Sequence, residues 1–376
     1  MGYGRAAPAK GWHYKTSGSV KGVTQKPARP FGPGTLLWRL MLLSEFDYAL
    51  PEELIAQQPL DERDSSRMLV LYRREGRWED RAFRDLPSFL HPGDCLVLND
   101  SRVLPSRLYG HRTGHTGHIE VLLLHPIASD ALTWRALVRP GRKMRTGDGL
   151  EFAPFLHGKI LGRGELGERT VQFETDRDIY QALEQVGHIP LPPYIKRPDT
   201  AADRERYQTV FARERGSVAA PTAGLHFTAG TLEQCRSAGA EIAHVTLHVG
   251  LGTFQPLHQD EVERNTLHTE RYGVSPEAWQ TIGGAERVIA AGTTSVRTVE
   301  SVAATGQLGG ETDLFIRPGF DFRRVDAMLT NFHLPRTSLL VLVCAFAGRE
   351  LALAAYRHAV EQCYRFFSYG DCMLIL

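Results

Sequence analysis

The alternation of hydrophobic and polar positions divides the chain into two regions of different character. Between residues 104 and 178, short runs of alternating apolar and polar side chains follow one another at intervals of about ten residues, separated by glycine-rich turns. This pattern is typical of the strands of a small barrel or sandwich. The predicted strands cover residues 119–124, 133–138, 149–152, 159–161 and 170–173.

From about residue 178 onward, the apolar positions follow the period of helices that alternate with strands. Apolar strands at 242–249 and 287–291 lie between helical patterns, and this alternation indicates an α/β layer architecture. The longest uninterrupted apolar run, 339–347, is interpreted as a further buried strand. We therefore predict a larger α/β layered domain built from both chain ends, 41–103 and 179–376, with a small β-barrel-like domain inserted at 104–178. The helical patterns cover residues 178–186, 228–238, 276–283, 294–304 and 350–361.

Length and composition agree with two globular domains. The 376 residues exceed the size of one ordinary domain, and 42% of them are hydrophobic and 23% charged. The five cysteines are scattered and include no C-x-x-C pair, so no metal site is predicted and a reducing cytoplasm is expected. The run 339–347 is about half as long as a membrane helix, so no membrane association is expected.

The net charge of +1 hides an asymmetry along the chain. Residues 1–40 hold seven of the 44 basic side chains and none of the 43 acidic ones, so the remainder is net negative. We expect a disordered basic extension there, because the segment has little apolar surface to bury. The alternatives are a basic arm for RNA, a targeting leader, or a chain that truly starts near residue 41, which is the favoured interpretation. Any nucleic-acid site in the remainder must be a local basic patch.

A strand, a turn of small residues and a helix follow one another around the motif GTTSVR. The motif places Thr294 and Ser295 at the start of the helix and Arg297 one turn further on. Helix N-termini bind anions through their free N–H groups. We therefore expect these three residues to bind a carboxylate or a phosphate of a substrate. The alternative is an ordinary capped helix.

Two further motifs combine histidine with glycine. PTAGLHF contains His226, and HVGLGTFQP begins with His248 at the end of a strand. The glycines allow the backbone to approach a ligand closely. His244 would share a strand face with His248, but no third ligand supports a metal site. For each histidine, a buried structural role is the alternative.

Polar residues also interrupt the apolar C-terminal region. NFHLP supplies Asn331 and His333, and YRFFSYGD supplies Tyr369 and Asp371 beside aromatic residues of the expected core. Buried donors and acceptors need partners, so these four residues predict positioned hydrogen bonding in a cleft.

Basic residues mark three more segments. Arg67 precedes the strand of SSRMLVLYR, and Arg102 lies in NDSRVLPSRL at the predicted domain junction, so both are expected to contact substrate. LPPYIKRPD adds Tyr194, Lys196 and Arg197, which suit an RNA backbone and a stacked base. A solvated charged loop is the alternative for this last segment.

Five of these motifs together resemble one family. In chain order they are PTAGLHF, HVGLGTFQP, GTTSVR, NFHLP and YRFFSYGD. They resemble the S-adenosylmethionine:tRNA ribosyltransferase-isomerases of queuosine biosynthesis, over the chain from about residue 45 to the C-terminus. The resemblance implies an α/β domain with an inserted β-barrel domain, and a monomeric cytoplasmic transferase.

The resemblance also implies the reaction. The ribosyl moiety of S-adenosylmethionine moves to 7-aminomethyl-7-deazaguanine at the tRNA wobble position and is isomerised, which gives epoxyqueuosine tRNA and releases adenine and methionine. S-adenosylmethionine is consumed as a substrate, and no cofactor is implied. The protein must supply a base near the carbon next to the sulfonium and an acid for the departing adenine.

Residue roles follow as hypotheses from this chemistry. One of His226, His248 and His333 carries a proton, with Asp371 as a further catalytic candidate. The amine of the substrate is an alternative base.

Other residues are expected to hold the substrates. Arg297 and Arg102 orient charged parts of them, and Asn331 contacts the adenine or the modified base. Tyr194 or Tyr369 stacks on a base that has left the anticodon.

Three other functions are alternatives. A conventional methyltransferase uses the same donor, but the chain lacks a glycine-rich first strand-turn near its start. A Ser-His-Asp hydrolase is disfavoured because there is no G-x-S-x-G motif. A pure RNA-binding module would lose tRNA binding when residues 1–40 are removed, whereas an enzyme would change little.

Overall fold

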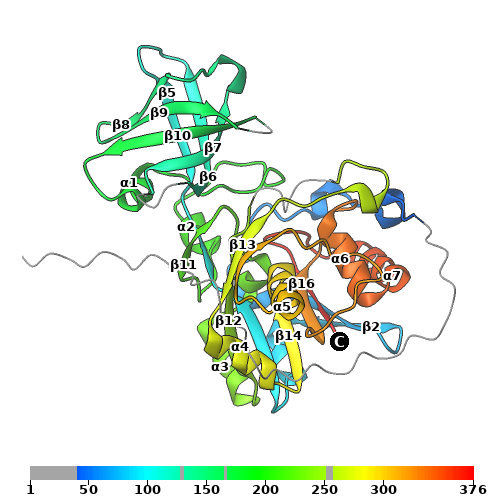
Figure 1. Ribbon diagram of the computed structural model, residues 1–376. Helices are drawn as coiled ribbons and strands as arrows, with labels where there is room; N and C mark the ends of the chain where they lie inside the picture. The colour runs from blue at the N-terminus through cyan, green and yellow to red at the C-terminus, as the bar shows by residue number, and fades with distance from the viewer. Residues whose placement is uncertain (1–39, 128–130, 165–166, 251–256) are drawn as a thin grey trace, which may run out of the picture.

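A nine-stranded mixed sheet forms the centre of the larger domain (Figure 1). The computed structural model describes residues 40–127, 131–164, 167–250 and 257–376, so the predictions for 1–39 and for the end of HVGLGTFQP lie outside the described residues. Strands β12, β3, β14 and β16 are parallel, whereas β17 and β1 run in the opposite direction. In sheet order, the strands are β15 (Gly309–Thr312), β13 (Glu270–Val274), β12 (Glu241–Leu247), β3 (Asp94–Asn99), β14 (Arg287–Ala291), β16 (Ala327–Asn331), β17 (Cys372–Ile375), β1 (Arg67–Tyr72) and β2 (Arg77–Ala82).

Strand β3 shows why the sheet is buried on both faces. Cys95 and Val97 point into one hydrophobic core and Leu96 and Leu98 into the other, because successive side chains of a strand alternate. A continuous apolar run of this kind is typical of a parallel strand that is covered on both sides.

Helices cover both faces of the sheet. Apolar side chains of α3 and of the 3₁₀ helix η4 pack on one face, and those of α4, α5, α6 and α7 pack on the other. The bounds are Phe83–Phe89 for η4, Ala229–Ser237 for α3, Pro276–Gly284 for α4, Thr293–Thr305 for α5, Ser338–Ala347 for α6 and Arg349–Glu361 for α7.

Helix α6 corrects one prediction, since the run 339–347 is a helix and not a buried strand. Thr337 caps its start by accepting a hydrogen bond from Leu340 N (3.4 Å), and Gly348, with φ of 89°, ends it. A buried helix and a buried strand both give uninterrupted apolar runs, so only length and flanking caps distinguish them. No single helix in the described ranges is long and apolar enough to cross a membrane; α6 and α7 pass that test only as a pair, bent by 115°.

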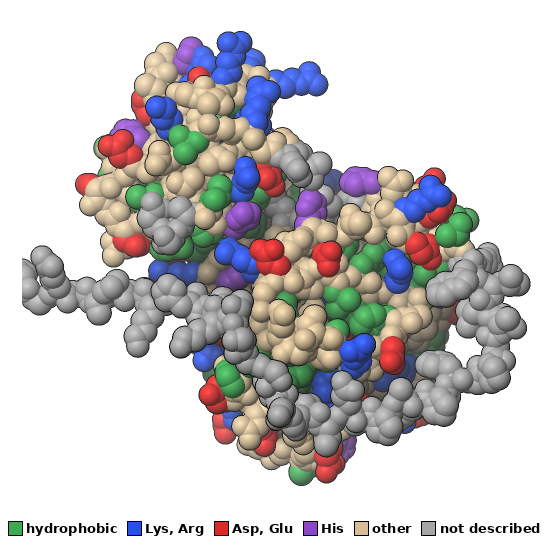
Figure 2. All heavy atoms as spheres, in the orientation of Figure 1, with side chains coloured by type: hydrophobic (Ala, Val, Ile, Leu, Met, Phe, Trp, Pro, Cys, Tyr) green, Lys and Arg blue, Asp and Glu red, His purple; other side chains and the backbone are tan. Residues whose placement is uncertain are grey.

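The smaller domain is a closed barrel, which forms a separate lobe (Figure 2). Its strand order is β10-β7-β6-β5-β8-β9, and each neighbouring pair is antiparallel. The observed larger α/β domain with a small β-barrel confirms the predicted fold class. The strands are β5 (Arg107–Arg112), β6 (His118–Pro126), β7 (Thr133–Arg139), β8 (Gly149–Ala153), β9 (Leu156–Arg163) and β10 (Glu168–Thr175).

Helix α1 (Ile179–Val186) belongs to the barrel, although the predicted boundary at 178/179 assigns it to the α/β domain. Ile179, Ala182 and Leu183 are buried in the barrel core. The periodicity of a helix does not say which core receives its apolar face, so the boundary differs from the predicted one by the length of this helix.

Two short parallel strands form the junction between the domains. Strand β4 (Ser101–Val103) leads into the barrel, and β11 (Glu214–Ser217) follows the return to the α/β domain. The returning chain also contains the short helix α2 (Asp203–Arg206).

Candidate functional site

The predicted site residues gather at one edge of the large sheet, which we call the carboxyl edge. Here β12, β3, β14 and β16 end, and β17 and β1 begin. Ligands of open α/β sheets bind beyond such strand ends, where the flanking helices leave on opposite faces. Helices α3 and α5 pack on opposite faces of this sheet. The strand ends and starts place Arg67, His248, Thr294, Asn331 and Asp371 at this edge.

The turn between β14 and α5 brings three motifs together. Thr294 Oγ1 accepts a hydrogen bond from Asn99 Nδ2 (3.1 Å), and Ser295 Oγ donates to a carbonyl of β14 (2.7 Å). Gly292 is the N-cap residue, with φ of 93°, and a Cβ there would lie 3.6 Å from the side chain of Ala223. GTTSVR, NDSRV and PTAGLHF therefore meet here. Both predicted anion-binding side chains have internal partners, and no described side chain caps α5.

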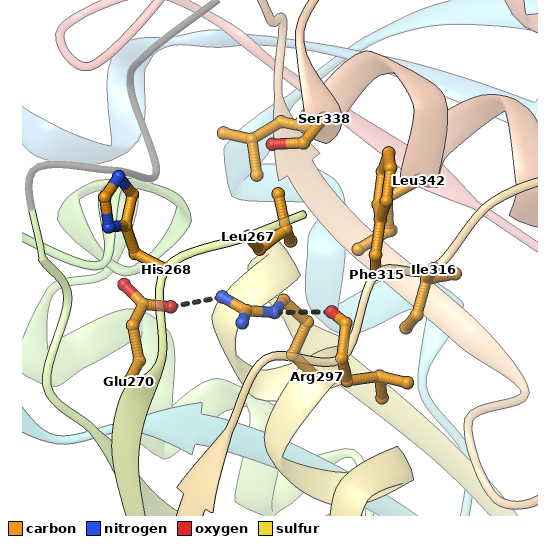
Figure 3. Close-up of a pocket in the computed structure, with 10 residues that line it drawn as sticks. Leu267, His268, Glu270, Arg297, Phe315, Ile316, Ser338 and Leu342 are labelled. Carbon is orange, nitrogen blue, oxygen red and sulfur yellow. Dashed lines mark hydrogen bonds and ion pairs between the residues drawn. The ribbon is translucent and has the colours of Figure 1, made fainter. Parts of the chain in front are cut away.

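Arg297 binds a carboxylate, but the carboxylate belongs to the protein (Figure 3). Its guanidinium pairs with Glu270, and both side chains are only 4% exposed. Nε donates to Leu314 O (3.1 Å), and Nη2 donates to Thr312 O (3.4 Å). Glu270 also accepts a hydrogen bond from Gly250 N (2.8 Å). The contacts of Arg297 therefore tie α5 to β13 and to the segment after β15.

A mostly apolar pocket of about 340 Å³, including space open to solvent, surrounds this ion pair (Figure 3). Leu267, Phe315 and Leu342 line it together with Ser338 and His268. Because the buried charges neutralise each other, the pocket offers apolar surface and shape rather than a free charge.

His226 lies in a second pocket at the carboxyl edge. The pocket has a volume of about 300 Å³, again including open space, and Arg63, Ser66, Arg206 and Tyr369 also line it. His226 is 4% exposed, and its Nδ1 lies 2.7 Å from Ser66 Oγ. Its Nε2 is buried and has no hydrogen-bond partner within the described residues. A predicted proton carrier with an open ring nitrogen thus lines a pocket.

Asn331 indicates which nitrogen of His226 carries the proton. Asn331 Nδ2 donates to Phe367 O (2.9 Å), and a carbonyl can only accept, so the orientation of this amide is assigned. Its Oδ1 is buried and lacks a partner of ordinary geometry in the described chain, as does His226 Nε2. An acceptor near the ring favours the tautomer with Nε2–H, in which Nδ1 accepts from the Ser66 hydroxyl.

The electrostatics of this pocket keep His226 neutral. Burial lowers its pKa to about 4, an effect that Asn331 opposes and that the charges of Arg63 and Arg365 reinforce. Arg63 and Arg206 direct N–H groups to backbone carbonyls, with distances of 2.8 Å to Glu205 O and 2.7 Å to Asp61 O. Neither guanidinium pairs with a carboxylate among the described residues, so the pocket suits an anionic group.

His333 has the environment of a structural residue. Its Nε2 lies 2.7 Å from Thr330 Oγ1, and its backbone N–H donates to Tyr356 Oη (3.1 Å). Its carbonyl accepts from the hydroxyl of Tyr48. Burial lowers the pKa of His333 to about 3. These contacts favour the structural alternative over proton transfer.

His248 and Arg102 lie at the junction of the two domains. A Cβ on Gly216 would lie 2.8 Å from His248 Nδ1, so the ring packs against β11. Burial and the charge of Arg271 lower the pKa of His248 to about 4, while Asp100 opposes the shift. His248 Nδ1 has no hydrogen-bond partner in the described chain, and Arg102 forms no ion pair or hydrogen bond through its side chain there. Both remain available for a substrate.

Asp371 holds β1 against β17. Its carboxylate accepts hydrogen bonds from Arg67 N (2.9 Å) and Arg365 N (2.8 Å), and it is 1% exposed. The Arg67 guanidinium lies 4.0 Å from the ring centre of Tyr364 and donates to Gln362 O (2.8 Å). These contacts give both residues structural partners, although the Arg67 side chain is still 43% exposed.

Tyr369 and Arg197 share one buried partner, Asp203. Tyr369 Oη donates to Asp203 Oδ1 (2.7 Å), and Arg197 binds the same carboxylate with both Nη atoms (2.7 and 2.8 Å). Thr200 adds a backbone hydrogen bond (2.8 Å). Arg197 therefore holds the returning chain through Asp203. The sequence predicts that its guanidinium binds RNA, but in the structure both Nη atoms are bound to this carboxylate.

The other two residues of the predicted RNA-binding segment also have internal partners. Tyr194 stacks on Phe367 with ring centres 4.6 Å apart, and its hydroxyl lies 2.6 Å from Ser368 Oγ. Lys196 pairs with Glu52 at the surface. Tyr194 thus packs against Ser368, which lines the His226 pocket, and Lys196 is the exposed cation of the segment.

Several residues of the site are not predicted by the sequence motifs. Ser66 directly precedes Arg67, so the motif SSRMLVLYR contained a signal for it. Arg63, Asp203 and Glu270 gave no signal, because single charged residues in polar segments are common. Their partners lie far away in the sequence, as the separation of 166 residues between Tyr369 and Asp203 illustrates.

Comparison with known proteins identifies the family of the chain. The chain is 63% identical over 352 residues to the S-adenosylmethionine:tRNA ribosyltransferase-isomerase of Solibacter usitatus, covering 89% of this chain and all of the relative. The protein of the same name from Desulforamulus reducens is 49% identical over 345 residues, with the same coverage. The crystal structure of S-adenosylmethionine tRNA ribosyltransferase from Thermotoga maritima is similar with a TM-score of 0.51 and 39% identity, over 88% of this chain and all of that one. Residues 43–375 match the queuosine biosynthesis protein family, and the chain belongs to this family of enzymes.

Proposed function

We propose that this protein transfers the ribosyl moiety of S-adenosylmethionine to 7-aminomethyl-7-deazaguanine at the wobble position of tRNA and isomerises it to give epoxyqueuosine tRNA. Adenine and methionine are the other products, and S-adenosylmethionine is a substrate rather than a cofactor. The observation that carries the proposal is the His226 pocket, in which the His226 ring, beside the Asn331 amide, lies close to two guanidinium groups that lack described carboxylate partners. We expect the enzyme to act as a monomer on cytoplasmic tRNA.

His226 and Asn331 can recognise a base edge together. In the assigned tautomer, Nε2–H of His226 is a donor and Oδ1 of Asn331 is an acceptor. Adenine offers a ring nitrogen beside an amino group, and a deazaguanine offers a carbonyl beside a ring N–H. Either edge would satisfy two buried atoms that lack other partners among the described residues. This agrees with the expectation that Asn331 contacts adenine or the modified base.

Arg63 and Arg206 supply the positive charge of the pocket. Guanidinium groups bind carboxylates and phosphates in bidentate geometry, so the methionine carboxylate or an RNA phosphate fits beside them. Their backbone partners hold the two side chains in place before the substrate arrives.

Proton transfer divides into two tasks. As a neutral imidazole, His226 can donate a hydrogen bond from Nε2–H to adenine and stabilise the negative charge that develops on the leaving ring as the glycosidic bond breaks, without giving up its proton. The carbon next to the sulfonium needs a separate base. His248 and the amine of the substrate are the candidates for this base.

A single incubation tests the proposed reaction. Purified protein is mixed with S-adenosylmethionine and tRNA that carries 7-aminomethyl-7-deazaguanine, and mass spectrometry follows adenine, methionine and the digested nucleosides. Equal amounts of adenine and methionine, with a new epoxycyclopentane-bearing nucleoside, are expected. S-adenosylhomocysteine in place of these products would instead indicate a methyltransferase, and unchanged substrates would refute the proposal.

Histidine variants test the residue roles in the same assay. His226→Ala is expected to lower turnover by about 10²–10³-fold, the usual loss when one hydrogen-bond donor to developing negative charge is removed. His358→Ala, on the outer helix α7, is the matched control and should leave turnover unchanged. Near-wild-type turnover of the His226, His248 and His333 variants alike would show that no histidine carries the proton.

A further inference from the structure

The barrel carries a group of basic side chains that the proposed function has not used. Arg139, Arg142, Lys143 and Arg145 are exposed, and their side chains form no ion pair or hydrogen bond within the described residues. Figure 2 shows Lys and Arg spheres gathered at the outer end of the smaller lobe. We call these four side chains the barrel-end cluster.

The cluster lies at the end of the barrel away from the junction. Strand β5 begins at the junction, where Arg107 and His188 exchange backbone hydrogen bonds (3.2 and 2.8 Å). Since β6 is antiparallel to both β5 and β7, β7 also runs away from the junction and ends at Arg139. A strand of this length spans roughly 20 Å. The cluster is therefore remote from the carboxyl edge.

The backbone that carries the cluster is firmly held. Met144 is 2% exposed in the barrel core, and Arg169, itself 6% exposed, donates from Nη2 to Gly141 O (2.8 Å). Arg145 N donates to Asp148 Oδ2 (2.8 Å). The four cations thus project from the end of β7 and the ordered loop that follows it, which reduces the ordering cost of binding.

We propose that the barrel-end cluster binds backbone phosphates of the tRNA, an inference that rests on tRNA being the substrate of the proposed function. Residues 41–376 are net negative, so a local group of exposed cations without described acidic partners is a surface that would attract a polyanion. The exposed residues of 139–147 include no large apolar side chain, since Met144 is buried. An anionic membrane surface, which favours inserted apolar side chains, is therefore the weaker partner.

Three variants of the full chain test this docking surface. The first neutralises the cluster, the second keeps its charge, and the third removes four exposed arginines at the sheet edge opposite the carboxyl edge, as a control for net charge. The substitutions are Arg139→Gln, Arg142→Gln, Lys143→Gln and Arg145→Gln in the first; Arg139→Lys, Arg142→Lys and Arg145→Lys in the second; and Arg74→Gln, Arg77→Gln, Arg236→Gln and Arg323→Gln in the third.

Binding of fluorescently labelled tRNA is measured between 50 and 200 mM salt, together with turnover over a range of tRNA concentrations. Neutralising the cluster is expected to raise Kd at least ~10-fold near 100 mM salt and to reduce the slope of log Kd against log salt by about 2–3, since each phosphate contact contributes about 0.7–0.9. KM for tRNA should rise in parallel while kcat stays within about twofold, because these side chains do not reach the reacting atoms. The lysine variant and the opposite-edge variant should both resemble the wild type.

Each outcome decides a different point. If the neutralised variant has the thermal stability of the wild type and binds tRNA with the same Kd and salt slope, the proposal is wrong. The same holds if the opposite-edge variant loses as much affinity, because long-range attraction would then explain the effect. If the cluster binds anionic vesicles but not tRNA, its partner is an anionic membrane surface and the proposed RNA contact is wrong. Because binding needs no turnover, wild-type protein that binds tRNA without releasing adenine would refute the proposed function alone.

Discussion

Removing one partner of the Arg297–Glu270 ion pair should destabilise the protein strongly. Both side chains are 4% exposed, so either single substitution leaves a buried charge without its counterion. Such a loss costs about 3–5 kcal/mol, whereas replacing both partners by apolar residues is often nearly neutral. The double variant Arg297→Met, Glu270→Leu also removes the partners of Leu314 O, Thr312 O and Gly250 N. We therefore expect it to lie about 1–3 kcal/mol below the wild type, at roughly 1 kcal/mol or less for each lost hydrogen bond.

Urea unfolding of the four proteins gives the coupling free energy directly as a double-mutant cycle. The double variant should be far more stable than the sum of the single losses allows. Turnover of the double variant, measured under conditions where it is folded, should remain. If the single losses simply add, the two charges do not depend on each other. If Arg297→Met abolishes turnover at unchanged stability while Glu270→Leu does not, Arg297 binds a substrate as the sequence predicts.

Two further substitutions test the framework of the site. His333→Ala should lower the free energy of unfolding by about 2–4 kcal/mol, because it leaves a cavity and removes the partner of Thr330, and calorimetry should detect the loss without an altered KM. Asp203→Asn should lower the free energy of unfolding by several kcal/mol at pH 7. Burial raises the pKa of Asp203, but the hydrogen bonds from Arg197 and Tyr369 have the larger effect and hold this pKa well below its usual range. Because the pKa of Asp203 is lower in the folded than in the unfolded protein, its carboxylate stabilises the fold above the unfolded pKa, near 3.9, and this stability is lost as the pH falls below that value. The free energies of unfolding of wild type and variant should therefore converge in acid. A difference that stays constant down to pH 2 would contradict this.

Much of the fold could be predicted because local patterns and tertiary contacts agree. The runs 119–124 and 133–138 became barrel strands, since one face of each is apolar and enters the barrel core. The strand predicted at 339–347 is wrong because a helix that is buried on all sides lacks the periodicity that distinguishes it from a strand. Strand β15, with the sequence GGET, has no apolar pattern and exists through its pairing with β13. Tertiary pairing overrides propensity in such short edge strands.

The site could be located from the sequence, but its contacts could not be assigned. Parallel strand ends share one edge, so motifs that follow strands converge there whatever their separation in the chain. The roles of individual side chains depend on partners that no motif contains. His226 and His333 look alike in sequence, yet His226 lines a pocket beside Asn331, whereas the Nε2 of His333 is bound to Thr330. Arg297 looked like a ligand-binding residue because Glu270 lies 27 positions earlier, outside any motif.

The polar residues of the carboxyl edge divide into framework and open atoms, and this division has a mechanistic consequence. The carboxylates of Asp371 and Asp203 accept hydrogen bonds from backbone and side-chain donors, and these bonds hold β1, β17 and the returning chain in place. Ser66 and Asn331 lie on this framework and set the direction of His226. Dipoles held in this way need little rearrangement during a reaction, which is the main source of electrostatic stabilisation in enzymes. Loss of a framework carboxylate should therefore lower stability and turnover together, whereas loss of the His226 ring should lower turnover far more than stability.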